Sequence, residues 1–275
     1  MFEAQDIVEQ AIDYHGKHVA VACSFGKDSM AILHMALKHN PDVKVIFENT
    51  GVQFPETYKY RNVMKEEWNL NLYESFPIKN FWQCRKEYGL PKCRKRGGKG
   101  SNAPKCCYFL KEKPGLILER KLGVNAVITG LQACESQSRK LLAMRYDSGH
   151  VPYTERDNIE FCSQRWYTRS TNKWNYHPIM NWSIEEVWKY TKGNNIPISE
   201  VYTKWGGIYP RSGCMTCTAY KSWECRLSVS HPKLYRMLKN WQLEEIRKEK
   251  KQTTLELATP IPPTAKAVGI LGGIL

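Results

Sequence analysis

The stretch that decides the fold is Cys23-Ser24-Phe25-Gly26-Lys27-Asp28-Ser29-Met30. The apolar, β-prone residues 18–22 precede it, and residues 30–37, which are rich in helix formers, follow it. The motif therefore lies on a strand–loop–helix transition, where backbone N–H groups and the positive helix end converge on an anion. Gly26 allows close approach to the backbone, Lys27 adds a positive charge, and the two serines add hydroxyl donors. This pattern predicts a phosphate or pyrophosphate site, although an ordinary turn would share its outline, and the Walker A spacing is absent.

The composition narrows the class of protein. The chain has 275 residues and a formal net charge of +14, which predicts polyanionic ligands such as a nucleotide or a nucleic acid, although a solvated lysine-rich surface would also produce it. No run of 18 apolar residues suggests a membrane span, and no signal-peptide pattern opens the chain, so we expect a cytoplasmic protein. Ten cysteines in such a chain favour metal, cluster or redox chemistry over disulfides.

Apolar stretches alternate with helical patterns along the chain. This order predicts an α/β fold with a doubly wound, mostly parallel sheet and flanking helices, whose ligands bind beyond the carboxyl ends of the strands. We expect a main domain over 1–235, followed by a C-terminal helix and a flexible or partner-docking tail over 236–275. Residues 145–175 are interpreted as irregular. Helices are expected at 2–14 and 28–39, and strands at 18–23, 43–47, 70–75 and 124–130.

Polar turns follow two of the expected strands. Thr50 and Gly51 come directly after the second strand, so they are expected to line the same crevice as the phosphate loop. Gly130 ends the strand at 124–130 and opens a turn that contains Glu135, Ser136 and Arg139. A plain turn in the first case, and a helix capped by Ser136 in the second, would be compatible with the same residues.

Four cysteines form two short clips. Cys106 and Cys107 are adjacent, and Cys214 and Cys217 form a C-x-x-C motif, which alone is common and could be a zinc or redox site. Four thiolates suit a [4Fe–4S] cluster, with zinc or unmetallated thiols as alternatives. Two other cysteines lie beside apolar stretches and are expected to be packing residues: Cys23 and Cys134.

These blocks together resemble the adenylyl-sulfate and phosphoadenylyl-sulfate reductases, which belong to the PP-loop, adenine nucleotide alpha-hydrolase-like superfamily. The first block is similar to the family's Ser-Gly-Gly-Lys-Asp-Ser loop, with Phe25 in place of the first glycine. Residues 48–57 are similar to Asp-Thr-Gly-x-x-Phe-Pro-Glu-Thr, and residues 130–139 to a block in which Gln132 replaces an arginine. The run from Cys106 to Pro114 is similar to the Cys-Cys-x-x-x-Lys-x-x-Pro run of the iron–sulfur type. The resemblance covers residues 18 to about 220.

The resemblance implies both ligands and chemistry. It implies a substrate phosphosulfate facing Arg139, which Glu135 orients, a thioredoxin-like or other thiol reductant, and a homo-oligomer. The implied activity is reduction of either nucleotide to sulfite in sulfate assimilation. The implied substrate-binding residues are Ser24, Phe25, Gly26, Lys27, Asp28, Ser29, Thr50, Gly51, Gly130, Glu135, Ser136 and Arg139, and the implied cluster ligands are Cys106, Cys107, Cys214 and Cys217.

One part of the family pattern is missing. The family nucleophile lies in a Glu-Cys-Gly-Leu-His segment, of which Glu224-Cys225-Arg226-Leu227 is only a partial echo, so the catalytic residue stays unassigned. This keeps a second class open, an iron–sulfur PP-loop sulfurtransferase that thiolates tRNA or DNA with ATP, because the basic residues 85–105 and the net charge suit nucleic acid. That basic stretch is interpreted as a mobile lid or a disordered insert. A non-catalytic nucleotide-binding regulator is the third class.

Overall fold

The structure is a computed structural model that describes residues 4–88, 105–135, 139–141, 143, 164–209, 212–217 and 223–258. The chain divides into two compact units, Met1–Trp223 and Glu224–Leu275. Most of the predicted basic stretch at 85–105, the predicted site residue Ser136 and the tail after 258 lie outside the described residues.

The first unit is built on a six-stranded sheet with the order β3-β2-β1-β4-β6-β5. All neighbouring strands are parallel except β5, which runs antiparallel to β6. The predicted mostly parallel α/β fold is therefore confirmed. The strands are β1 (Val19–Ala22), β2 (Lys44–Glu48), β3 (Leu72–Ser75), β4 (Ala126–Thr129), β5 (Arg165–Thr168) and β6 (Lys173–Tyr176).

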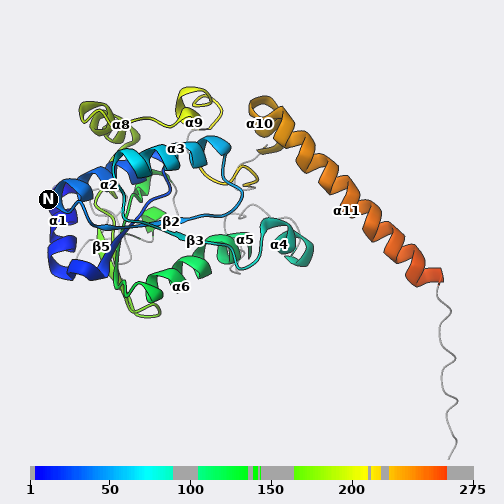
Figure 1. Ribbon diagram of the computed structural model, residues 1–275, viewed down its shortest axis with the longest axis horizontal. Helices are drawn as coiled ribbons and strands as arrows, with labels where there is room; N and C mark the ends of the chain where they lie inside the picture. The colour runs from blue at the N-terminus through cyan, green and yellow to red at the C-terminus, as the bar shows by residue number, and fades with distance from the viewer. Residues whose placement is uncertain are drawn as a thin grey trace, which may run out of the picture. The chain divides into compact units, whose positions relative to one another are not determined.

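Helices cover both faces of this sheet (Figure 1). The helices of the first unit and its short helical turns are α1 (Ala4–His15), η1 (Gly16–His18), α2 (Lys27–His39), α3 (Pro55–Glu67), α4 (Phe81–Tyr88), α5 (Lys105–Cys107), η2 (Tyr108–Glu112), α6 (Lys113–Lys121), η3 (Ala133–Glu135), α8 (Ile184–Gly193) and α9 (Glu200–Thr203). The helices expected at 2–14 and 28–39 are confirmed as α1 and α2, within two residues at each end.

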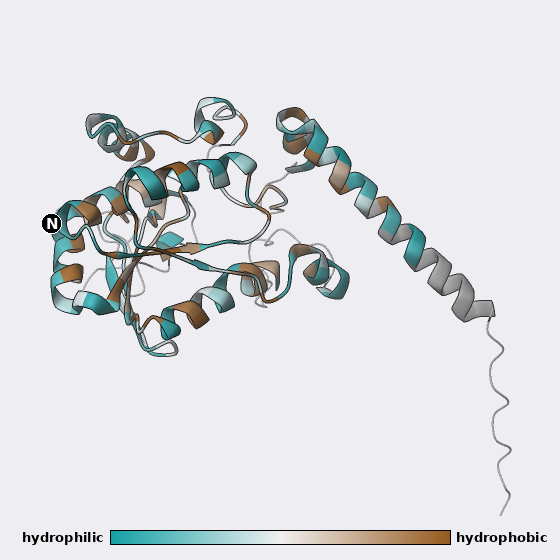
Figure 2. Ribbon diagram, viewed as in Figure 1, coloured by the Kyte–Doolittle hydropathy of each residue, from teal (hydrophilic) through white to brown (hydrophobic). Residues whose placement is uncertain are grey.

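Alternation along each strand produces two apolar layers, because successive strand side chains point to opposite faces. Val19 and Val21 of β1 belong to a large core cluster that also holds side chains from α1, α2, α3 and α8. Ala20, between them, packs in a second cluster with Leu118 and Leu122 of α6 and its vicinity. Figure 2 shows the apolar residues gathered on the strands and on the helix faces turned toward them. Each large side chain buried in this way stabilises the fold by about 1.5–3 kcal/mol.

The strand order reverses at β1, which places a ligand crevice next to it. Strands β2 and β3 lie on one side of β1, and β4 and β6 lie on the other. In an open α/β sheet, the loops that leave such a switch point diverge and leave room for a ligand. Ala22 pairs with Thr129, so β1 and β4 end side by side and the loops that follow them begin at the same edge.

The irregular structure expected over 145–175 is wrong for the last part of that range. Residues 165–176 form the β5–β6 hairpin, which completes one edge of the sheet. Its strands are rich in aromatic side chains, which favour pleated, half-buried surfaces, and Trp166 is buried. Asn172 has a φ of +52°, a left-handed conformation that asparagine tolerates in turns.

The described part of the second unit, up to residue 258, is helical. It contains all but the first residue of α10 (Trp223–Ser230) and the whole of α11 (Pro232–Ala258). Pro232 begins α11 because the first position of a helix tolerates a residue without an N–H group. Lys239 of α11 lies 3.0 Å from Glu224 of α10. None of the helices in the described ranges combines the length and the apolar character needed to cross a lipid bilayer.

Candidate functional site

The predicted phosphate loop joins the end of β1 to the first turn of α2. The hydroxyl oxygen of Ser29 accepts hydrogen bonds from the backbone N–H groups of Ser24 and Gly26, each at 3.2 Å, and donates to the Gly26 carbonyl at 3.0 Å. The Ser24 hydroxyl lies 3.2 Å from the same oxygen. Ser29 therefore closes the loop into a compact ring at the amino end of α2, the location that favours anions.

Phe25 keeps the loop in a conformation usual for glycine. Its φ is +56°, in the left-handed region that costs a residue with a Cβ roughly 1–2 kcal/mol. Its ring is fully buried and packs edge-on against Phe47 and Tyr60. Burial of this ring offsets the backbone strain, so the replacement of the family's glycine preserves a glycine-like loop.

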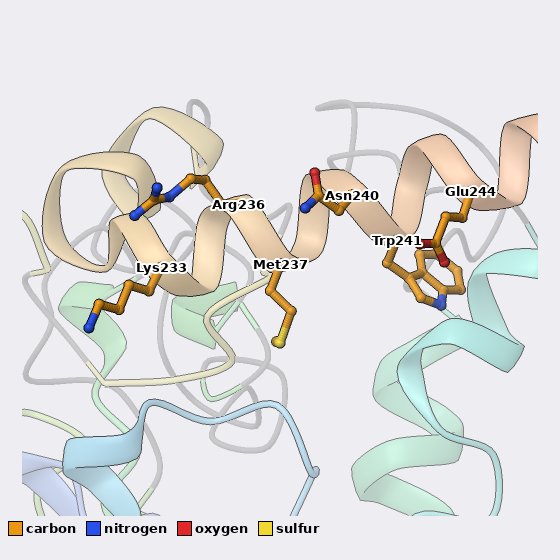
Figure 3. Close-up of a pocket in the computed structure, with 6 residues that line it drawn as sticks. All are labelled: Lys233, Arg236, Met237, Asn240, Trp241 and Glu244. Atoms are coloured by element: carbon orange, nitrogen blue, oxygen red, sulfur yellow. The ribbon is translucent and has the colours of Figure 1, made fainter.

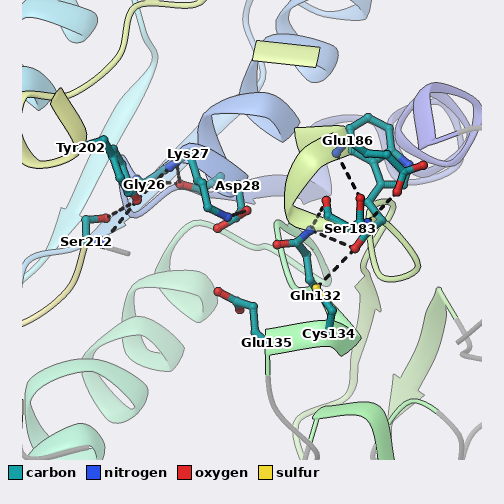
Figure 4. A network of polar contacts seen from close by, with 12 residues as sticks. Gly26, Lys27, Asp28, Gln132, Cys134, Glu135, Ser183, Glu186, Tyr202 and Ser212 are labelled. Carbon is teal, nitrogen blue, oxygen red and sulfur yellow. Dashed lines mark hydrogen bonds and ion pairs between the residues drawn. The ribbon is translucent and has the colours of Figure 1, made fainter. Parts of the chain in front are cut away.

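Lys27 and Asp28 bring charge to the amino end of α2. The Lys27 side chain is only 4% exposed and forms an ion pair with the Asp28 carboxylate. The backbone N–H of Lys27 donates to the hydroxyl of Tyr202 at 3.2 Å, and that hydroxyl also accepts from the N–H of Ser212 at 3.1 Å. Figure 4 shows these groups together.

The turn after β4 packs against this loop. A Cβ on Gly130 would lie 2.6 Å from the Asp28 carbonyl carbon and 2.8 Å from the Ser29 nitrogen, so only glycine lets β4 approach the start of α2. Further along the turn, Glu135 forms an ion pair with Arg139, the pairing that the resemblance implies.

Cys134, in the same turn, is exposed, so its expected role as a packing residue is wrong. The 3-10 turn η3 carries its thiol out of the apolar layer. Partial burial raises the pKa of this thiol, and the nearby Lys27 charge only partly opposes the rise. The expectation for Cys23 is confirmed, since its side chain is buried in the main core.

Thr50 and Gly51 lie against the C-x-x-C segment. Gly51 has a φ of +71°, which a turn of this shape requires. The Cys214 thiol donates to the Thr50 hydroxyl at 3.4 Å. The backbone N–H of Met215 donates to the Val52 carbonyl at 2.8 Å, so a short antiparallel bridge fixes this segment to the loop after β2.

The two cysteine clips are neighbours. Cys106 and Cys214 pack against one apolar cluster built around Val52, Phe81 and Leu110. A hydrogen bond with Cys107, burial and the nearby thiols raise the pKa of Cys106 far above its usual range. Burial raises the pKa of Cys214 to about 11, with smaller contributions from Cys217 and Cys107. Within the part of the chain that the structure describes, no three His, Cys, Asp or Glu side chains are arranged to hold a metal ion.

A charged pair stands beside these thiols. The Lys111 ammonium lies 3.1 Å from the Glu48 carboxylate at the end of β2. Glu48 contributes most to raising the pKa of Lys111, and the Cys214 and Cys107 thiols raise it further. A Cβ on Gly115 would lie 2.6 Å from Glu48 Oε1, so this glycine leaves room for the carboxylate.

His177, which the sequence analysis did not single out, is buried behind the crevice. Its Nδ1 lies 2.6 Å from the Thr129 hydroxyl at the end of β4, and its ring packs on Trp166 with centroids 4.1 Å apart. In the described part of the chain its Nε2 has no hydrogen-bond partner. Burial, assisted by Arg139 and Lys173, lowers the pKa of His177 to about 3.

Two hollows lie on the described surface, and neither outlines a nucleotide-sized crevice at the phosphate loop. One, of about 620 Å³, runs along α11 in the second unit and is lined by Lys233, Arg236, Met237, Asn240, Trp241 and Glu244 (Figure 3). It contains none of the predicted site residues. The other lies next to Phe25 and Lys27 and encloses only about 10 Å³, which is room for about one water molecule.

The fold and this loop define an α/β nucleotide-binding protein of the PP-loop class. The model of the phosphoadenosine phosphosulfate reductase domain matches residues 18–220, and the chain belongs to that family. It is 28% identical over 225 residues to adenosine 5'-phosphosulfate reductase 2 of Bacillus subtilis, covering 79% of this chain and 80% of that one. It is equally identical over 222 residues to an adenosine 5'-phosphosulfate reductase of Oceanobacillus iheyensis, covering 80% and 79%.

A solved structure shares the fold. The phosphoadenylyl-sulfate reductase of Candida auris, in a phosphate complex, superposes with a TM-score of 0.56 at 22% identity and covers 79% of this chain and 90% of that one. This likeness supports the arrangement of strands and helices described above.

Sequence reasoning missed three residues that the structure places at the site. Tyr202 and Ser212 connect the loop to the C-x-x-C segment, and His177 supports the end of β4. The local sequence could have pointed only to His177, because it directly follows a β-prone residue, Tyr176, and precedes a proline, which places it at the end of a strand. The connections made by the other two depend on contacts between distant segments.

Proposed function

We propose that this protein is a thiol-dependent reductase of adenylyl sulfate or its 3′-phosphate form, which releases sulfite and the adenine nucleotide in sulfate assimilation. Family membership and the named relatives support this function over the sulfurtransferase. The observation that carries it is the junction of the phosphate loop with the C-x-x-C segment through Tyr202. A reductase of a nucleotide phosphosulfate needs this proximity, because the phosphate and the sulfur-transfer chemistry belong to one small molecule.

The proposed reaction has two steps. A thiolate attacks the sulfur of the phosphosulfate, the S–O bond to the nucleotide phosphate breaks, and an S–S bond forms in an enzyme thiosulfonate. A dithiol such as a reduced thioredoxin then attacks the enzyme sulfur, sulfite leaves, and the mixed disulfide is resolved to the oxidised donor. The donor supplies both electrons, and the nucleotide phosphate is the first leaving group.

The chain's own charges stabilise that leaving group. The Lys27 ammonium and the amino end of α2 lie at the loop, and we propose that they bind the nucleotide phosphate together with Ser24, Gly26 and Ser29. Arg139, held by Glu135, would face the phosphosulfate oxygens. Donors that are already oriented in this way stabilise charge as it develops, at little reorganisation cost.

The attacking thiolate is unassigned. Cys225 is the cysteine of the partial family motif, and its side chain is exposed on α10. If Cys225 is the nucleophile, Cys225→Ser abolishes sulfite release while nucleotide binding persists. Full activity of this variant would exclude it.

We further propose that Cys106, Cys107, Cys214 and Cys217 hold a [4Fe–4S] cluster. Four thiols from two clips are the donor set that such a cluster needs, and both clips contact the same apolar cluster. Because the described side chains do not form a ligand set, the thiols would have to turn toward one centre. The cluster would supply a metal centre beside the crevice, and the Lys111 charge nearby would tune it.

The decisive experiment measures sulfite release by anaerobically prepared protein with each nucleotide and reduced thioredoxin. The reductase predicts sulfite from at least one of them. ATP consumption that depends on tRNA or DNA, with no sulfite, would instead establish the sulfurtransferase. Iron and acid-labile sulfide in the same preparation test the cluster separately, with four of each per chain expected.

The choice between the two nucleotides, the location and the oligomeric state are still to be considered. The excess of Lys and Arg favours the 3′-phosphorylated nucleotide, while the cysteine set favours the unphosphorylated one, so the assay compares both. A cytoplasmic location and a homo-oligomer remain predictions, the former supported by ten cysteines suited to a reducing compartment.

A further inference from the structure

Tyr202 joins two parts of the site that are far apart in the sequence. Its hydroxyl accepts hydrogen bonds from the backbone N–H groups of Lys27 at 3.2 Å and Ser212 at 3.1 Å. It also lies 3.4 Å from the Ser212 side-chain oxygen. One hydroxyl thus satisfies a donor in the first turn of α2 and a donor at the start of the C-x-x-C segment (Figure 4).

The phosphate loop packs tightly against Tyr202 and Ser212 at Gly26, and we call this contact the junction. A Cβ on Gly26 would lie 2.7 Å from the Ser212 hydroxyl oxygen and 3.2 Å from the Tyr202 hydroxyl. Gly26 therefore leaves the space in which these two side chains reach the loop. A displacement of the loop by a few tenths of an ångström is transmitted to Ser212, because close-packed groups have no room to absorb it.

The far end of the same segment is also fixed. The N–H of Met215 donates to the Val52 carbonyl, and the Cys214 thiol donates to Thr50. The Tyr202 ring is itself held, since it meets Trp188 edge-on with centroids 5.5 Å apart. The segment is thus held near Ser212 by Tyr202 and near Cys214 by the loop after β2, and the Tyr202 hydroxyl is hydrogen-bonded to both this segment and the phosphate loop.

We propose that Tyr202 is a positioning residue that makes the placement of residues 212–217, and with it that of Cys214 and Cys217, depend on occupancy of the phosphate loop. A phosphate at the amino end of α2 competes with the Tyr202 hydroxyl for the Lys27 N–H or packs against it. Either event changes the hydrogen bond that the same hydroxyl accepts from Ser212. The inference rests on the proposed function in one respect, namely that the loop binds an adenine nucleotide.

Hydrogen exchange of the backbone amides at 212–217 tests this coupling without using catalysis. In the wild-type protein, saturating adenylyl sulfate should change the exchange rates at 212–217. In Tyr202→Phe, these amides should exchange about threefold to tenfold faster without ligand, as expected for the loss of one hydrogen bond, and the nucleotide should no longer change them. The affinity for nucleotide should fall by less than about threefold while kcat falls by more, because the ring and the loop remain.

Tyr190→Phe is the matched control. It removes another half-buried tyrosine hydroxyl, which bonds to His34 Nδ1 at 2.9 Å, and should leave exchange at 212–217 unchanged. Gly26→Ala disturbs the same junction from the loop side and should also speed exchange at 212–217.

Two outcomes separate this inference from the proposed function. If adenylyl sulfate binds but exchange at 212–217 in the wild type does not respond, or responds equally in Tyr202→Phe, the coupling is refuted and the reductase proposal stands. If neither adenine nucleotide binds, the reductase proposal fails, and inorganic pyrophosphate, which needs only the loop, becomes the probe. Absence of a response to pyrophosphate would then refute the coupling as well.

Discussion

At the scale of single residues, Phe25 combines a strained backbone with a buried ring, and substitution can separate the two effects. Phe25→Ala should destabilise the protein by about 3–5 kcal/mol, because it removes the buried ring and keeps the left-handed φ. Phe25→Gly also loses the ring but relieves the strain, so it should be about 1 kcal/mol more stable than the alanine variant. Urea unfolding of the three proteins measures both differences. An alanine variant as stable as the glycine variant would show that the position is unstrained.

His177 should make stability depend on pH. Its pKa is about 3 in the folded protein against an ordinary value of 6.5, so the unfolded chain binds the proton first. The free energy of unfolding therefore has its full value, as far as His177 is concerned, above about pH 6.5. It decreases as the pH falls toward 3, by up to about 1.4 kcal/mol per pH unit. His177→Gln should lose less stability over this range in urea titrations. Parallel curves for the two proteins would contradict burial of a neutral imidazole.

The residues of the phosphate loop were predictable because their types and spacing carry the chemistry locally. Gly26, Lys27 and Ser29 follow one another within four positions, and the structure places their groups at the amino end of α2. Tyr202 was not predictable as a site residue, because a tyrosine in an apolar, helical context is usually a packing residue. Its role depends on which segment lies within 3.2 Å of its hydroxyl.

At the scale of elements, the contact between β4 and α2 depends on Gly130. A Cβ there would lie within 2.6–2.8 Å of the Asp28 and Ser29 backbone, which cannot move without shifting the helix. Gly130→Ala should therefore cost about 1–3 kcal/mol and weaken nucleotide binding by at least tenfold. Gly207→Ala is the control, since a Cβ there meets nothing within 4 Å. Urea unfolding and equilibrium dialysis check the two effects, and unchanged binding in Gly130→Ala would contradict this account.

The contact between α6 and the end of β2 predicts a loss of activity without a large loss of stability. The three atoms nearest to a Cβ on Gly115 all belong to the flexible side chain of Glu48, so the carboxylate can move aside and release Lys111. Gly115→Ala should therefore stay within about 1 kcal/mol of the wild-type stability, aided by the higher helix propensity of alanine. It should nevertheless lower kcat for sulfite release severalfold.

Glu48→Gln should reproduce that loss of activity, because it also frees Lys111 from its partner 3.1 Å away. Gly193→Ala, where a Cβ meets nothing, should not. Thermal unfolding run beside the sulfite assay distinguishes a charge effect from unfolding. Wild-type activity in both Gly115→Ala and Glu48→Gln would show that the ion pair of Lys111 with Glu48 does not affect sulfite release.

The strands at the centre of the sheet could be predicted from local sequence. Residues 19–22 and 126–129 are short apolar runs next to glycine-containing turns, which is the pattern of a buried parallel strand. The β5–β6 hairpin was missed because its two strands are only four residues long each and no glycine marks the turn between them. Asn172, with its positive φ, performs the role that a glycine would have signalled.

At the scale of the whole molecule, the sequence showed two cysteine clips but could not show that they meet. Cys106 and Cys214 are more than 100 positions apart, and their common contact with one apolar cluster depends on the bridge between the C-x-x-C segment and the loop after β2. The resemblance to the reductase family had already implied that the two cysteine clips act together. The nucleophilic cysteine differs from the clips, because neither the sequence motifs nor the fold identifies it.

The net charge of +14 makes a last prediction about the whole chain. An excess of 41 basic over 27 acidic residues attracts a polyanionic nucleotide over long range, and salt screens this attraction, with a Debye length of about 10 Å at 0.1 M and about 3 Å at 1 M. The KM for the nucleotide phosphosulfate should therefore rise severalfold between these concentrations. The kcat should change much less, because the contacts of Lys27 are short and its side chain is buried.

Steady-state kinetics in a sodium chloride series measure both constants, with sucrose as an uncharged control for viscosity. Circular dichroism at each concentration confirms that the protein stays folded. A KM independent of salt would mean that the positive charge serves some surface other than the nucleotide crevice. A parallel fall in kcat would instead mean that the thiol donor, and not the nucleotide, is the partner held by charge, because its encounter then limits turnover.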